Sequence, residues 1–311
     1  MISNGGLLMN SQTKTELSES TLTREEKFGK AVGSKFYLAA LITVGAVALF
    51  TAASVIYNLI SAIILFVNPE MTMADIGGTR VSGIISGGFG AIMTALLDAL
   101  MPVAMIFTLV YMIKLIRDKN SITPEGVRQL GHGAGVLHLY SILMLIDNAF
   151  IAFFLFLPAF KLPFSARAAA DATVFEQVFT FLDTPSVYTT LFSWLEGSEN
   201  GFASVALAFI TGALFLAFAF VQLMTFGFFK NYFKDVEISL ENKNYIIEKK
   251  APLIVPCIFA GANALVAIFV LISGSWLTAL SSLAISAFTV ATSLLLKKLE
   301  AEKLGVVDEE E

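Results

Sequence analysis

Six stretches of this chain are each long and apolar enough to cross a lipid bilayer as a helix. A crossing takes about 20 mostly apolar residues, because the hydrocarbon core is roughly 30 Å thick and a helix rises about 1.5 Å per residue. The stretches that reach this length are residues 36–67, 99–116, 134–160, 202–229, 253–272 and 276–296. The sequence therefore predicts an all-α fold, a polytopic membrane bundle of six transmembrane helices.

The composition agrees with a membrane protein and argues against several other classes. Apolar residues make up 56% of the 311 residues and charged residues 14%, whereas an average soluble domain has about 45–50% and about 25%. A soluble surface would need more charge, and a disordered chain would need lower hydrophobicity. The net charge of −5 argues against nucleic acid as a partner. A single cysteine, Cys257, excludes an internal disulfide, and we expect no metal centre and no cofactor.

Two further segments contain apolar residues that do not fit a simple span. The tract over residues 82–116 is too long for one crossing. It is either a re-entrant or interfacial helix over about 82–97 followed by the span over 99–116, or one long helix kinked at Pro102. Between the third and fourth spans, residues 161–201 hold two apolar clusters too short to cross, and we expect them to form an outer helical cap.

The lysines and arginines predict how the bundle is oriented. With six spans, the segments on one side of the membrane hold 17 of the 20 basic residues and those on the other side hold 3. Because short cytoplasmic loops are enriched in basic residues, we expect the basic side to be cytoplasmic. Both termini then lie in the cytoplasm, as a polar tail over residues 1–35 and an acidic tail over 297–311. We expect this multi-pass protein in the cell membrane.

Two basic-side segments have the pattern of helices outside the bilayer. In the N-terminal tail, Thr23 and Glu26 have the spacing of a capping box, which predicts a short helix before the first span. After the fourth span, the connector over residues 230–252 continues a helical apolar period at Phe229, Phe233, Val236 and Leu240. This amphipathic connector either lies on anionic headgroups or docks a protein partner.

Two carboxylates at membrane depth are candidates for function. Asp147, beside Asn148, lies midway along the third span, and Asp98 lies in the tract before Pro102. Ionisable groups in a bilayer are costly, about 2.5–3.5 kcal/mol each on insertion scales, and often mark ion or proton pathways. The two aspartates either share one buried site that binds a cation or relays a proton, or are each satisfied locally by a hydroxyl or a backbone N–H.

A row of hydroxyl side chains runs along one face of the sixth span. Its members, spaced four, four, three and four residues apart, are Thr278, Ser282, Ser286, Thr289 and Ser293. The row either lines a polar pathway or joins helices through small residues and hydrogen bonds. The fifth span adds one amide. The candidate intramembrane polar site therefore comprises Asp98, Asp147, Asn148, Asn263, Ser282 and Ser286.

The residue patterns favour two classes of function. No HExxH, phosphate-loop or GxSxG motif occurs, so we expect no enzyme. The first hypothesis is a bundle that moves or senses a small solute or an ion through its polar interior. The second is a non-transporting membrane subunit or scaffold that docks a partner at residues 230–252. The lipid bilayer itself is a partner in both cases, and a homo-oligomer is compatible with either.

The orientation is testable with reporter fusions. Reporters placed after residue 120, after residue 240 and at both chain ends should all report the cytoplasm, because the basic segments are retained there. A reporter within residues 161–201 should report the opposite side. A result that puts residues 120 and 240 on different sides would contradict the six-span topology.

Overall fold

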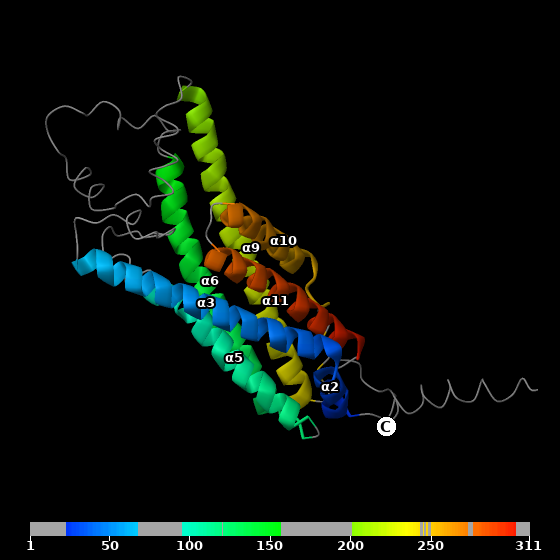
Figure 1. Cartoon of the computed structure of the whole chain (residues 1–311). Coiled ribbons are helices and arrows are strands. Elements are labelled where there is room, and N and C mark those ends of the chain that lie inside the picture. The colour runs from blue at the N-terminus through cyan, green and yellow to red at the C-terminus, as the bar shows by residue number, and fades with distance from the viewer. Residues whose placement is uncertain are drawn as a thin grey trace, which may run out of the picture.

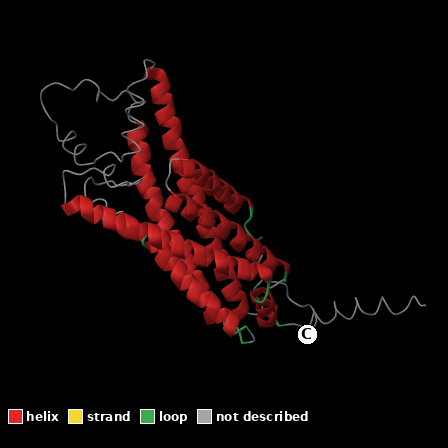
Figure 2. Ribbon diagram, viewed as in Figure 1, coloured by secondary structure: helices red, strands yellow, loops and turns green. Residues whose placement is uncertain are grey.

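The computed structural model describes residues 23–67, 95–119, 121–156, 201–242, 245, 247, 250–272 and 276–302. Within these residues the regular secondary structure is all α-helix, joined by loops and turns (Figures 1 and 2). The helices are α2 (Arg24–Val32), α3 (Lys35–Val67), α5 (Leu100–Arg117), α6 (Pro124–Phe156), α9 (Gly201–Glu241), α10 (Ile254–Ile272) and α11 (Trp276–Ala301).

Six of these helices are long and apolar enough to cross a membrane. The qualifying segments are Lys35–Ser61, Ala95–Arg117, Pro124–Ala149, Gly212–Glu241, Ile254–Ile272 and Trp276–Ala301. Their outward surfaces are apolar: Ile42 is 63% exposed, Leu49 65% and Phe269 69%. Large exposed apolar surfaces of this kind suit lipid contact and not water. The predicted all-α bundle with six transmembrane helices is therefore confirmed.

The helix before Pro102 begins earlier than the bounds of α5. Residues 95–98 are helical, and the N–H groups of Ala99 and Val103 donate to the carbonyls of Ala95 and Ala99. Helical hydrogen bonding therefore continues across Ala99, and Asp98 lies in a turn continuous with α5. The rest of the predicted 82–97 helix and the predicted outer cap over 161–200 lie outside the described residues, so the choice between the two arrangements stays open.

The most extensive contact joins α6 and α9, which run antiparallel along each other (Figure 1). Near one end, Gly131 faces Phe233, and further along Gly227 faces the His138 ring. Near the other end, the rings of Phe156 and Phe209 lie 4.8 Å apart between centroids. The contact thus spans about 25 residues of α6, or about 37 Å, which exceeds the thickness of the hydrocarbon core.

The other helices pack around this pair through specific contacts. The Tyr37 hydroxyl of α3 donates to the Met112 carbonyl of α5 at 2.9 Å. The Ser286 hydroxyl of α11 donates to the Ala260 carbonyl of α10 at 2.8 Å, within an antiparallel hairpin. Aromatic rings join α9 to this hairpin, with centroids 5.5–6.5 Å apart, at Phe218, Phe226, Phe229, Phe259 and Phe288.

We call the end of the bundle where α3, α6 and α10 start and α5, α9 and α11 finish the basic end. Every lysine and arginine within the described residues lies there. The short helix α2 covers part of it, and the predicted capping box of Thr23 and Glu26 is present. The Arg24 guanidinium donates to the carbonyls of Ser239, Asn242 and Tyr245 at 2.8, 3.4 and 3.0 Å. Arg24 therefore caps the carboxyl end of α9, where carbonyls lack helical partners.

The structure confirms that the helix of the fourth span continues through the connector, as α9, to Glu241. The apolar repeat of the connector is buried within this chain, at Phe229, Phe233, Val236 and Leu240. Because α6 runs beside α9 to the basic end and α2 also contacts α9, this apolar face packs inside the chain, which neither the headgroup nor the partner interpretation predicted. A partner at residues 230–252 would instead meet exposed polar side chains such as Lys230 and Lys234.

The close approach of α5 and α6 is testable at two glycines of α6. A Cβ at Gly133 would overlap the Thr108 hydroxyl, whereas a Cβ at Gly135 would meet no atom within 4 Å. We expect Gly133→Ala to destabilise the fold by about 1–3 kcal/mol through overpacking. Gly135→Ala should lose nothing and can gain up to about 1 kcal/mol of helix propensity. Reversible unfolding in detergent micelles would measure both variants.

A second substitution separates overpacking from other effects of Gly133→Ala. Adding Thr108→Ala removes the overlapping hydroxyl, so the double variant should recover stability relative to the sum of the single changes. Equal losses at Gly133 and Gly135 would contradict the described α5–α6 contact.

Candidate functional site

The predicted carboxylates lie on the pair formed by α5 and α6. The Tyr140 hydroxyl of α6 donates to an Asp98 carboxylate oxygen at 3.4 Å, and the tyrosine is buried. Asp98 belongs to the helical turn that leads into α5. Because the partner comes from another helix, the contact ties the start of this span to the middle of α6. A carboxylate has acceptor sites for several donors, and this hydrogen bond occupies one of them.

Asp147 lies on the same face of α6 as Tyr140. The face that contacts α5 at Gly133 and Tyr140 continues, with the spacing four, three, four, three, through Gly133, Leu137, Tyr140, Met144 and Asp147. Asp147 is only 9% exposed. It lies seven residues, or about 10 Å along the helix, beyond Tyr140. The two aspartates therefore share one helix face but are offset by about two turns; we call Asp98, Tyr140 and Asp147 the carboxylate face.

Both carboxylates lie far from the basic end. At the rise of an α-helix, Asp98 is about 24 Å from Lys114 along its helix, and Asp147 about 28 Å from Arg128. These lengths are close to the thickness of the hydrocarbon core and place both aspartates toward its far side.

The two candidate amides hydrogen-bond within their own helices. Asn148 donates to the Met144 carbonyl at 2.7 Å, and Asn263 donates to the Phe259 carbonyl at 2.9 Å. Both side chains are buried. A bond to the carbonyl four residues earlier satisfies the amide donor without a ligand or a second helix. These contacts support a structural role for the two amides within their own helices.

Three members of the hydroxyl row of α11 are also bonded to backbone. Ser286 bridges to α10, as described above, while Thr289 and Ser293 donate to the carbonyls of Ile285 and Thr289. Ser282 is buried on the same helix. In hydrocarbon, such bonds satisfy hydroxyl groups and allow close helix packing. The six candidate residues thus divide between the α5–α6 pair and the α10–α11 hairpin.

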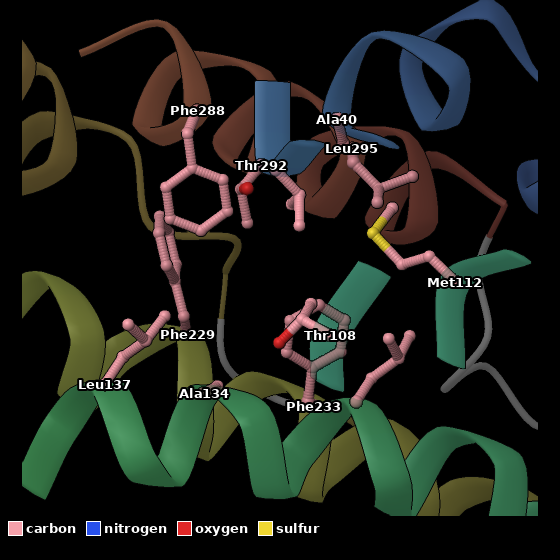
Figure 3. A pocket seen from close by; sticks show the side chains of 12 residues that line it. Ala40, Thr108, Met112, Ala134, Leu137, Phe229, Phe233, Phe288, Thr292 and Leu295 are labelled. Atoms are coloured by element: carbon pink, nitrogen blue, oxygen red, sulfur yellow. The ribbon is translucent and has the colours of Figure 1, made fainter. Parts of the chain in front are cut away.

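A small cavity lies between α3, α5, α6, α9 and α11 in the interior (Figure 3). Its volume is about 30 Å³, and its walls are mostly apolar, including Leu137, Phe229 and Phe288. Thr108 and Thr292 are its two hydroxyl-bearing wall residues, and the Thr108 hydroxyl donates to Ala104. An apolar cavity of this kind stays dry, so it offers no polar route through the bundle. Sequence reasoning missed it because five separate helices form its wall.

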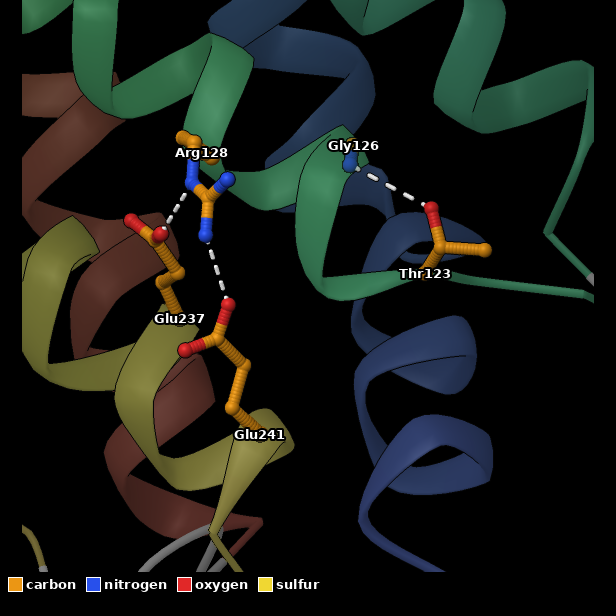
Figure 4. Close-up of polar contacts among 5 residues, drawn as sticks. All are labelled: Thr123, Gly126, Arg128, Glu237 and Glu241. Atoms are coloured by element: carbon orange, nitrogen blue, oxygen red, sulfur yellow. Dashed lines mark hydrogen bonds and ion pairs between the residues drawn. The ribbon is translucent and has the colours of Figure 1, made fainter.

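An ion-paired cluster at the basic end was also missed. Arg128 of α6 forms ion pairs with Glu237 and Glu241 of α9, the second at 2.7 Å (Figure 4). The same figure shows the Gly126 N–H donating to the Thr123 hydroxyl, 3.4 Å away, in the first turn of α6. In the sequence, this cluster was indicated only by the four-residue spacing of Glu237 and Glu241, which places both glutamates on one helix face. Arg128 is 45% exposed, so solvent screens both pairs and they contribute little to stability.

Within the part of the chain that the structure describes, no group of three or more His, Cys, Asp or Glu side chains is arranged to hold a metal ion. No protein-family model, curated protein or solved structure matches this chain. The fold and its apolar outer surface define a polytopic α-helical membrane protein. Any finer functional assignment has to come from its own residues, of which the carboxylate face is the most unusual group.

The packing role of the α11 hydroxyl row is testable by cysteine labelling. The chain has one cysteine, so Cys257→Ala gives a background for single variants. Ser282→Cys, Ser286→Cys and Ser293→Cys should resist a charged, membrane-impermeant thiol reagent, because dry helix packing excludes it. Glu125→Cys, at an exposed position of the basic end, is the positive control. Labelling of the row at the control's rate would indicate a water-filled pathway instead.

Proposed function

We propose that this protein is a multi-pass membrane protein that senses or moves a proton or a small cation through its carboxylate face. The observation that carries the proposal is the Tyr140–Asp98 hydrogen bond, with Asp147 buried on the same face of α6. We further propose that the protein resides in the cell membrane with its basic end in the cytoplasm, which the 17 to 3 division of basic residues supports.

A carboxylate is costly to place in a bilayer. An ionised aspartate costs about 2.5–3.5 kcal/mol at the centre of the hydrocarbon core on insertion scales, and the cost of Asp98 and Asp147 is smaller because they lie near the ends of their spans. An apolar residue at either position would avoid this cost without disturbing the helix period. Carboxylate oxygens accept a proton or bind hard cations, and either event removes the buried negative charge. The carboxylate face therefore has a chemical reason to change state with pH or with cation concentration.

The size of the interior favours a very small ligand. The central cavity has a volume of about 30 Å³, and its walls are mostly apolar. Three members of the hydroxyl row (Ser286, Thr289 and Ser293) and the two candidate amides donate to backbone carbonyls. These features support a proton or a single cation at the carboxylate face over a larger polar solute that crosses between α10 and α11. We propose no catalytic role.

A second candidate function is a membrane subunit that binds a partner at the basic end. The observation that favours it is the extension of α6 and α9 there, held by Arg128 and by the Arg24 cap. These contacts hold the helices of that end together, and charged side chains are exposed on its surface. Capture of a stoichiometric partner through Lys230 and Lys234, lost in a Lys230→Glu/Lys234→Glu variant, would favour this function.

The primary proposal is testable with purified protein in proteoliposomes. An internal pH-sensitive dye would report proton movement driven by an imposed potential, with and without Na⁺ or K⁺. Hydrogen exchange of the reconstituted protein as a function of pH would report sensing without transport. We expect Asp147→Asn to reduce either signal at least about tenfold, because the amide cannot exchange a proton. Asp98→Asn and Tyr140→Phe should cause smaller losses.

The matched control is Asp118→Asn, which makes the same chemical change at an exposed position beyond the end of α5. It should leave both signals unchanged. Unfolding in detergent would confirm that the variants fold. Equal signals from wild type, Asp147→Asn and Asp98→Asn, or no response to pH or cations in the wild type, would overturn the proposal.

A further inference from the structure

Four exposed cations gather where α3 begins and α5 ends. They are Lys35, Lys114, Arg117 and Lys119, which we call the α3–α5 corner. The hydrogen bond from Tyr37 to the Met112 carbonyl sets the relative position of the two antiparallel helices. By that register, Lys35 lies level with Lys114 to within about one turn, and Arg117 follows Lys114 by about one turn.

The short helix α2 holds this corner in place. Its Gly29 lies against the Lys119 carbonyl so closely that a Cβ there would be 2.6 Å from the oxygen. Buried side chains of α2 on the same helix, Phe28 and Val32, belong to the central core. The corner is therefore a fixed surface assembled from three segments.

Counter-charges are few at the corner. Within the described residues, no ion pair joins any of the four corner cations to a carboxylate, whereas Arg128, Lys297 and Lys298 at the same end are paired with glutamates. The acidic residue inside the corner, Asp118, is exposed and offsets only one of the positive charges. The exposed cations Lys230, Lys234 and Lys250 have no ion pair within the described residues either, so the corner is distinguished by four cations on neighbouring segments and not by the absence of pairs alone.

The surface next to the cations is apolar and exposed. Leu38 lies one turn along α3 from Lys35, and Val110 and Ile113 lie one turn before Lys114 and Arg117 on α5. Residues three or four apart share a helix face, so each cation lies at the edge of an exposed apolar strip. This combination fits an amphipathic molecule with an anionic head, and not a free anion or a hydrophilic protein surface.

We propose that the α3–α5 corner binds an anionic phospholipid, with the headgroup phosphate between Lys35, Lys114 and Arg117. The acyl chains lie along the strip of Leu38, Val110 and Ile113. Arginine suits this role because its planar guanidinium makes paired hydrogen bonds to phosphate oxygens. The proposal does not depend on the carboxylate face, which lies toward the other end of the bundle.

Native mass spectrometry of the full chain would test the proposal. The protein would be released from nanodiscs of phosphatidylcholine alone or of phosphatidylcholine mixed with phosphatidylglycerol. We expect wild type to retain phosphatidylglycerol, and the variant Lys35→Gln/Lys114→Gln/Arg117→Gln to bind it at least about tenfold more weakly. The matched control is Lys230→Gln/Lys234→Gln/Lys250→Gln, which removes the same charge from other exposed positions and should retain the lipid.

Three outcomes would overturn the proposal. Equal loss in both triple variants would indicate unspecific surface charge, and equal retention in both would remove the corner from lipid binding. Displacement of the lipid by inorganic phosphate at matched concentration would indicate a free-anion site. Should the triple variant unfold in phosphatidylcholine nanodiscs, the same binding comparison would use two double variants. These are Lys35→Gln/Lys114→Gln and its control Lys230→Gln/Lys234→Gln.

Discussion

The absence of water in the hydrocarbon core is the constraint on which the rest of this structure depends. Every buried donor has to find an acceptor inside the protein, and helices satisfy their backbones internally. The side chains follow the same rule: Thr51, Thr108, Ser141, Thr225 and Ser281 donate to carbonyls four residues earlier. Most of the polar residues of the membrane region thus serve the packing of helices, and the two candidate carboxylates among them are Asp147, which is buried, and Asp98, which is half-buried.

The packing of α6 against α9 decides which face of α6 is left for the other helices. Glycines of α9 admit large side chains of α6, as Gly212 does for the Phe156 ring and Gly227 for the His138 ring. One face of α6 therefore packs against α9, and a different face, which carries Gly133, Tyr140 and Asp147, contacts α5 at Gly133 and Tyr140. The carboxylate face lies on this second face of α6. The two proposed sites lie at different levels of the same helices, the carboxylates toward one end and the α3–α5 corner at the other.

Particular residues show where sequence reasoning reached its limit. The helical period from Phe229 to Leu240 correctly predicted that α9 continues to Glu241, because periodicity reports the backbone conformation. The same period could not reveal what covers the apolar face, since lipid, a partner and the chain itself demand the same pattern. Likewise the Arg24 cap joins residues more than 200 positions apart, a contact with no local signal.

By itself, the sequence determined the number of spans, the helical class and the collection of basic residues at one end, because each follows from local hydrophobicity and charge. Only the tertiary structure decided which polar groups meet. The offset of about two turns between Asp98 and Asp147 depends on the register of α5 against α6, which the Thr108–Gly133 and Asp98–Tyr140 contacts fix. The register between helices is set by side-chain packing, and no single segment encodes it.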